Sequence, residues 1–148
     1  MARPVPAARL RASNSTAGPR PKLSALSRIL IGLEGFLAFW AFAGSYAMLA
    51  DPHGGVLDVE LLDGSPFDSF IIPGITLLVT SGLFPVVVLV GALRRAAWAN
   101  SGHLAVGVVL VGWISAQVMF IGYVSWMQPT FFIYGLLVIA LALLDRDH

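Results

Sequence analysis

The sequence contains no cysteine and few charged residues. Only 11% of its 148 residues are charged, whereas 57% are hydrophobic. Without cysteine the chain cannot form disulfides, thiolate nucleophiles or cysteine-ligated metal sites, which excludes a membrane thiol oxidoreductase. Soluble domains are about one quarter charged, so this composition indicates an integral membrane protein.

Recognisable catalytic motifs are also missing. We find no internal repeat, glycine-rich phosphate loop, HExxH or Walker pattern. The acidic residues between positions 51 and 68 could in principle bind Ca²⁺, but their spacing matches no EF-hand. The chain is also too short to hold four spans and a separate catalytic domain. The sequence therefore predicts a protein that is not an enzyme and has no cofactor or metal site.

Residues 1–28 contain no acidic residue and no aromatic residue. This segment is rich in proline, alanine and serine, and it carries six basic residues: Arg3, Arg9, Arg11, Arg20, Lys22 and Arg28. Such a composition predicts a disordered tail that contacts anionic lipid. Nucleic acid is not an expected partner, because no aromatic side chain is present to stack on bases. The tail is too long for a cleaved signal peptide, so we expect an uncleaved anchor.

Long apolar segments account for most of the remaining chain. The expected fold is all-α, a bundle of four transmembrane helices in one membrane domain at 29–144, followed by a short C-terminus at 145–148. The expected spans are about 29–50, 69–93, 104–126 and 129–144. The lipid bilayer is thus the first expected partner.

The second span has features that predict both its start and its bends. Ser65 is a suitable N-cap, Pro66 suits the first helical position, and Asp68 would complete a capping box. A helix from residue 66 to 93 would be roughly 42 Å long, against a hydrocarbon core of about 30 Å. We therefore expect it to tilt or to bend at Pro73 or Pro85.

The loop between the third and fourth spans is expected to be short, and the loop between the first and second spans is expected to contain a regular segment. Two or three residues would separate the third and fourth spans, with Pro129 at the first position of the returning helix. Residues 57–61 alternate between apolar and acidic residues. This alternation predicts a short strand or a segment lying on the membrane surface.

The distribution of charge predicts the orientation. All nine lysine and arginine residues lie in the N-terminal tail, at Arg94 and Arg95, or at Arg146. Five of the eight acidic residues lie in the opposite loop. The positive-inside rule then places both termini in the cytoplasm. We expect a multi-pass protein of the cell inner (plasma) membrane.

Glu34 is the only charged residue inside an expected span. Small residues share its helical face, namely Ser27, Ala38, Ala41 and Ser45, so the carboxyl should face protein and not lipid. We expect no basic residue at its depth, where Val87, Val109 and Leu137 should lie. One interpretation is a carboxyl that exchanges a proton or binds a cation. The other is a carboxyl that is protonated or extends toward the interface, bonded to a neighbouring helix, to Arg94 or to His103.

Four further residues are candidates for an intramembrane site. Thr80 and Gln117 both lie roughly 16 Å from the outer helix ends, so we expect them to hydrogen-bond across the bundle. Such a bond contributes about 0.6 kcal/mol in membrane proteins. Trp113 and His103 share the face of Gln117. As a residue near a helix start, His103 should lie at a wet interface, and Arg94 and Arg95 are expected to be stop-transfer charges.

Three stretches resemble a group of uncharacterised small bacterial four-span integral membrane proteins. They are residues 64–74 (GSPFDSFIIPG), 112–117 (GWISAQ) and 122–129 (GYVSWMQP). The resemblance covers about residues 28–144 and implies four spans and a bacterial inner membrane. It implies no particular activity.

The chain is also similar in architecture to small multidrug-resistance transporters. These are short four-span proteins that work as proton-driven dimers with a glutamate in the first helix, and the similarity here is confined to the position of Glu34. Residues around Gly32 and Gly35 do not match that family, and neither does the long acidic loop.

Two functions are therefore considered. The first is a structural or accessory membrane component without enzymatic activity, whose expected partner is a second copy of the chain or another membrane protein. The alternative is a small dimeric proton-coupled transporter, with Glu34 as the coupling carboxyl and Gln117, Thr80 and Trp113 along its path.

Overall fold

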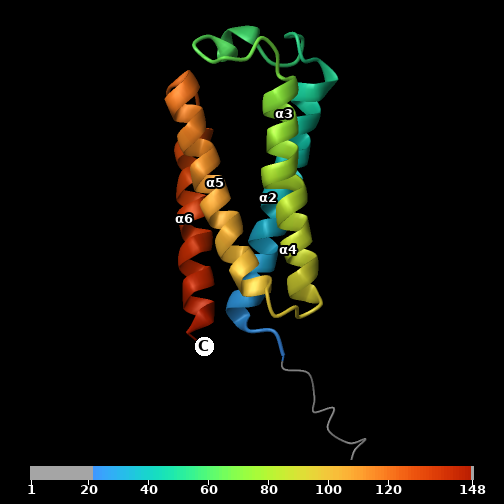
Figure 1. Ribbon diagram of the computed structural model, residues 1–148, viewed down its shortest axis with the longest axis vertical. Helices are drawn as coiled ribbons and strands as arrows, with labels where there is room; N and C mark the ends of the chain where they lie inside the picture. The colour runs from blue at the N-terminus through green and yellow to red at the C-terminus, as the bar shows by residue number, and fades with distance from the viewer. Residues whose placement is uncertain (1–21, 148) are drawn as a thin grey trace, which may run out of the picture.

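The computed structural model describes residues 22–147, and the predictions made for residues 1–21 lie outside this part of the chain. Four helices in it are long and apolar enough to cross a membrane (Figure 1). They are α2 (Ala25–Ala50), a second span composed of α3 (Ile71–Leu77), η2 (Leu78–Leu83) and α4 (Phe84–Leu93), then α5 (Ala99–Ile121) and α6 (Met127–Arg146). No strand occurs between residues 22 and 147, and the all-α four-helix prediction is confirmed.

Helix α2 begins earlier than the expected span. Ser24 is its N-cap, and the Ser24 hydroxyl oxygen accepts a hydrogen bond from the Ser27 backbone N–H at 2.9 Å. The last residues assigned to the basic tail are therefore helical. The stripe of small residues faces the bundle as predicted, with Ala38, Ala41 and Ser45 buried. Phe36, Phe39 and Tyr46 of the same helix are exposed.

The second span does not begin at Pro66, as its capping residues suggested. Ser65 accepts a hydrogen bond from the Phe67 backbone N–H at 3.3 Å, but residues 66–70 are not helical. The Phe70 N–H instead donates to the carbonyl of Pro52 at 3.0 Å, which ties this segment to the preceding loop. The helix starts at Ile71 because the loop contact replaces the first helical turn.

The second span continues without a break past both of its prolines. The six residues of η2 form wider π-helical turns that end two residues before Pro85, which lies in α4. Proline has no backbone N–H, so the carbonyl four residues earlier lacks its usual helical partner. A π-helical segment is one way in which a helix accommodates such a defect.

The connection between α5 and α6 is longer than expected. Helix α5 ends at Ile121, well before the predicted end at residue 126, because Gly122 has a φ of 71° that L-residues rarely adopt. The Gln128 side chain closes the loop by accepting from the Val124 N–H at 3.0 Å and donating to the Gly122 carbonyl at 3.1 Å. Helix α6 starts at Met127, so Pro129 is not at its first position.

The long loop between α2 and α3 contains no strand in the region where an alternating pattern suggested one. Residues Val59–Leu62 form a 3₁₀ helix, η1, and Leu62 is its buried residue. Its N-cap Asp58 accepts a hydrogen bond from the Glu60 N–H at 3.1 Å. This local capping bond favours a helical turn over an extended strand.

The bundle consists of two helix pairs, α5 with α6 and α2 with the second span (Figure 1). Glycines allow close contact in the first pair, where a Cβ added at Gly107 would lie 2.9 Å from the carbonyl oxygen of Gly135. The pairs meet where α2 begins and α6 ends, which we call the terminal end, and diverge toward residues 51–70, which we call the loop end (Figure 1).

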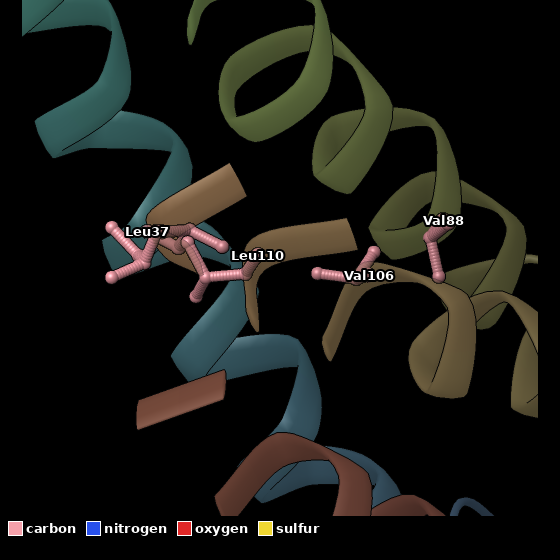
Figure 2. Close-up of a cluster of buried hydrophobic side chains, with 5 residues drawn as sticks. Leu37, Val88, Val106 and Leu110 are labelled. Atoms are coloured by element: carbon pink, nitrogen blue, oxygen red, sulfur yellow. The ribbon is translucent and has the colours of Figure 1, made fainter. Parts of the chain in front are cut away.

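A row of buried apolar side chains joins the two pairs. Figure 2 shows Leu37 of α2 beside Leu110 of α5, and Val106 of α5 near Val88 of α4. All four side chains are at least 97% buried. These four residues are called the apolar plug below.

Candidate functional site

Glu34 and His103 form a hydrogen-bonded pair inside the bundle. The Nδ1 atom of His103 lies 2.7 Å from the Oε1 atom of Glu34, and the two side chains are 1% and 0% exposed. The interpretation in which the Glu34 carboxyl bonds to His103 is therefore confirmed. The prediction that no basic residue shares the depth of Glu34 was wrong, as was the placement of His103 at a wet interface. Depth had been counted from an expected start at Leu104, whereas α5 begins at Ala99 and carries His103 inside the helix.

Each partner is placed by the helix face that carries it. Glu34 lies on the small-residue face of α2, between the buried residues Leu30 and Ala38. His103 lies one turn before Gly107, where α5 packs closely on α6. Arg94, another expected partner for the carboxyl, is exposed at the end of α4. The pair therefore joins α2 to α5 across the interface between the two helix pairs.

Tyr134 of α6 contributes a contact that the sequence did not suggest. Its hydroxyl donates a hydrogen bond to the backbone carbonyl of Leu33 at 2.6 Å, next to Glu34 in the chain. The signal available in the sequence was a tyrosine within an apolar span, because a buried tyrosine hydroxyl usually finds a partner. This bond fixes α6 against the turn of α2 that carries the carboxyl.

One carboxylate oxygen of Glu34 makes no hydrogen bond within the described residues. Glu34 Oε2 is buried and has no hydrogen-bond partner within residues 22–147. Such an atom is costly to bury, and an ionisable pair in a membrane is an inefficient way to stabilise a fold. A carboxyl bonded to an imidazole can instead take up or release a proton, and ionisable residues inside membranes commonly have functional roles.

A crevice of about 280 Å³ at the terminal end reaches His103. Its wall includes the polar side chains of Lys22, Arg95, Asn100 and Asp145. Glu34 does not line it. His103 is thus positioned between the crevice and the carboxyl.

Asp145 holds the two ends of the described chain together beside this crevice. The hydroxyls of Ser24 and Ser27 both donate to its carboxylate, the latter at 2.8 Å. These bonds join the start of α2 to the end of α6. The wall of the crevice is therefore fixed by side-chain contacts between its elements.

A larger cavity of about 460 Å³ lies toward the loop end, between the two helix pairs and below the long loop. Trp113 and Gln117 line it, as do Leu37 and Leu110 of the apolar plug. No charged side chain of residues 22–147 contributes to its wall. Because Leu37 follows Glu34 by one helical turn, the plug separates this cavity from the buried pair.

The expected hydrogen bond between Thr80 and Gln117 is not formed in the part of the chain that the structure describes. The Thr80 hydroxyl donates to the backbone carbonyl of Thr76 at 2.7 Å. A threonine within a helix can satisfy its hydroxyl in this way at the carbonyl four residues earlier. Thr80 also does not line the cavity that contains Gln117.

The predicted site residues therefore divide into two groups. Glu34 and His103 form the buried pair, Trp113 and Gln117 line the loop-end cavity, and Thr80 belongs to neither. Within residues 22–147, no cluster of three or more histidine, aspartate or glutamate side chains could hold a metal ion. No family model, curated protein or solved structure matches this chain.

Proposed function

We propose that this multi-pass membrane protein is a small proton-coupled transporter, without enzymatic activity, in which Glu34 and His103 form the coupling site. The observation that carries the proposal is the buried pair itself, with Nδ1 and Oε1 2.7 Å apart. His103 is buried, but it lines the terminal-end crevice and is bonded to Glu34. This geometry supports proton transfer from the crevice to the carboxyl through the imidazole, which has two ring nitrogens for that purpose.

The arrangement of the terminal-end crevice and the loop-end cavity supports a transport role. The polar crevice opens at the terminal end, the apolar cavity lies toward the loop end, and the apolar plug separates them. Under the positive-inside rule, the crevice would face the cytoplasm. A transporter of this kind changes conformation when its carboxyl gains or loses a proton, because the two states differ in their helix contacts.

The test is transport by purified protein reconstituted into vesicles. A pH gradient is applied, and uptake is measured for a panel of lipophilic cations and neutral apolar compounds. We expect the wild type to take up at least one compound and Glu34→Gln to take up none. Glutamine keeps the size and hydrogen bonding of glutamate but cannot exchange a proton.

Glu60→Gln is the matched control, since Glu60 is exposed in the long loop. Its uptake should equal that of the wild type. Equal transport by Glu34→Gln, or no transport of any compound by the wild type, would refute the proposal.

The second candidate function is a structural or accessory component, in which the pair is a permanent clamp between α2 and α5. Glu34 is completely buried and lines neither the crevice nor the cavity, which favours this function. An accessory protein should copurify with a membrane partner from native membranes. It should also retain partner binding in Glu34→Gln, whose amide can still bond to His103.

A further inference from the structure

Two cationic side chains line the terminal-end crevice. Lys22 and Arg95 are both exposed residues, so a ligand in the crevice can reach them. Within residues 22–147, Asp145 is the one acidic residue of the wall. Its carboxylate already accepts hydrogen bonds from two serine hydroxyls at the start of α2. The wall therefore carries more positive than negative charge, which favours an anionic ligand.

The backbone fixes Arg95 at this crevice. Arg95 follows α4 with a φ of 58°, a left-handed conformation in which glycine is the usual residue. Its N–H donates to the carbonyl of Ala92 at 2.9 Å, and the N–H of Ala96 donates to the carbonyl of Gly91 at 2.9 Å. These two bonds form a Schellman motif, which ends α4 in a defined turn. The guanidinium therefore extends from a fixed turn in the crevice wall.

The start of α5 adds backbone donors to the same wall. Ala99 and Asn100, in the first turn of this helix, both line the crevice. The N–H groups of Asn100 and Ser101 donate no hydrogen bond to an acceptor within residues 22–147. Helix N-termini bind anions through such N–H groups and through the positive end of the helix dipole. The positive end of α5 thus lies beside the two cationic side chains.

His103 forms the inner part of the wall. It is 1% exposed, but it lines the crevice, and its Nδ1 atom is bonded to Glu34. The Nε2 atom of His103 has no hydrogen-bond partner within residues 22–147, and unlike Glu34 Oε2 it is not fully enclosed. An imidazole whose first nitrogen is bonded inside the protein can bond to a ligand with its second nitrogen.

We infer that the terminal-end crevice binds a phosphate group, held by Arg95, Lys22 and the first turn of α5, with His103 at its inner side. A phosphate presents oxygen acceptors in several directions, which matches donors that come from separate parts of the chain. The crevice volume of about 280 Å³ is just below the usual range of drug-sized sites, roughly 300–1,000 Å³, and suits a ligand the size of a head group. The inference concerns binding at the crevice and does not depend on proton coupling at Glu34.

The test is equilibrium dialysis against the full-length protein in detergent, with empty micelles on the other side. The probes are inorganic phosphate, dihexanoyl phosphatidate and dihexanoylglycerol, which has the same acyl chains without phosphate. We expect phosphatidate to bind at least about 10-fold more tightly than dihexanoylglycerol, because its phosphate accepts charge-assisted hydrogen bonds. Equal affinities of these two lipids would overturn the inference.

Inorganic phosphate distinguishes the two sources of the phosphate group. If it binds as tightly as phosphatidate, the natural ligand is a soluble phosphate compound. If phosphatidate binds more tightly, the ligand is a lipid head group. Both results require a phosphate site, so both support the inference.

Two successive arginines provide a matched pair of variants. Arg95→Gln should weaken phosphatidate binding about 10–100-fold, because charge-assisted hydrogen bonds are lost. Arg94→Gln removes the same charge one residue earlier, but Arg94 does not line the crevice. Its affinity for phosphatidate should therefore equal that of the wild type. Equal losses in both variants would indicate general attraction to a basic surface and would contradict the inference.

Arg95→Gly separates binding from folding. Glycine adopts the left-handed conformation of this position more readily than arginine does, so thermal unfolding of the variant should occur at or above the temperature of the wild type. Its affinity for phosphatidate should nevertheless be as low as that of Arg95→Gln. Wild-type affinity in Arg95→Gly would show that the guanidinium does not contact the ligand, and would refute the proposed site.

Discussion

Replacing His103 by leucine is expected to destabilise the protein by about 3–5 kcal/mol, because Glu34 would remain buried without its hydrogen-bond partner. The pair is 1% and 0% exposed, so neither solvent nor lipid headgroups can replace the lost contact. Glu34→Met should destabilise less, since histidine can remain neutral when it loses a charged partner.

The double variant Glu34→Met with His103→Leu is the decisive comparison. Replacing both members of a buried ionic pair by apolar residues of similar volume is often neutral or stabilising, by about 1–4 kcal/mol. We therefore expect the double variant to recover the stability lost in His103→Leu. The free energy of unfolding of the wild type, the two single variants and the double variant is measured by reversible unfolding in mixed micelles. If the loss in the double variant equals the sum of the losses in the single variants, the two side chains do not interact directly.

Replacing Leu110 by serine is expected to open a proton leak through the bundle. Leu110 is 3% exposed, belongs to the apolar plug and lines the loop-end cavity. Its replacement by a small residue should destabilise the protein by about 2–5 kcal/mol. The serine hydroxyl would also make the new space polar enough to hold water between the cavity and the Glu34–His103 pair.

Leu110→Ala is the matched control for this leak. It removes a similar volume, but the space it leaves is apolar and should stay dry. We expect Leu110→Ser vesicles to dissipate a pH gradient faster than Leu110→Ala vesicles at equal protein content, and Glu34→Gln in the Leu110→Ser background to restore the slower rate. A leak of the same size in both single variants would show that the plug does not control proton access.

The sequence was informative where a single physical rule dominates. Apolar length predicted the four spans, and the small residues along α2 predicted the face that carries Glu34. Local signals failed where another contact satisfied the same backbone groups. Ser65 and Pro66 carry a good helix-start pattern, but the bond from Phe70 to Pro52 keeps that segment out of the helix.

The candidate site was only half predictable for a similar reason. An isolated acidic residue in an apolar span identified Glu34, and His103 was among its possible partners. The choice between His103 and Arg94 depends on how α2 and α5 are offset along the membrane normal. Counting residues within one helix gives no information about that offset, so His103 was assigned to the membrane–water interface. The pairing of Thr80 with Gln117 failed because the Thr80 hydroxyl has a nearer acceptor in its own helix.

In the proposed function, Glu34 exchanges a proton while it is paired with His103. Infrared difference spectroscopy of the reconstituted protein tests it most directly, because a protonated carboxyl has a carbonyl stretch that a carboxylate lacks. Spectra recorded across a pH titration should contain a carboxyl band that changes with pH in the wild type, is missing from Glu34→Gln and shifts in His103→Gln. A wild-type spectrum without any titrating band that Glu34→Gln removes would show that the pair is a fixed clamp, and would contradict the proton-coupled function.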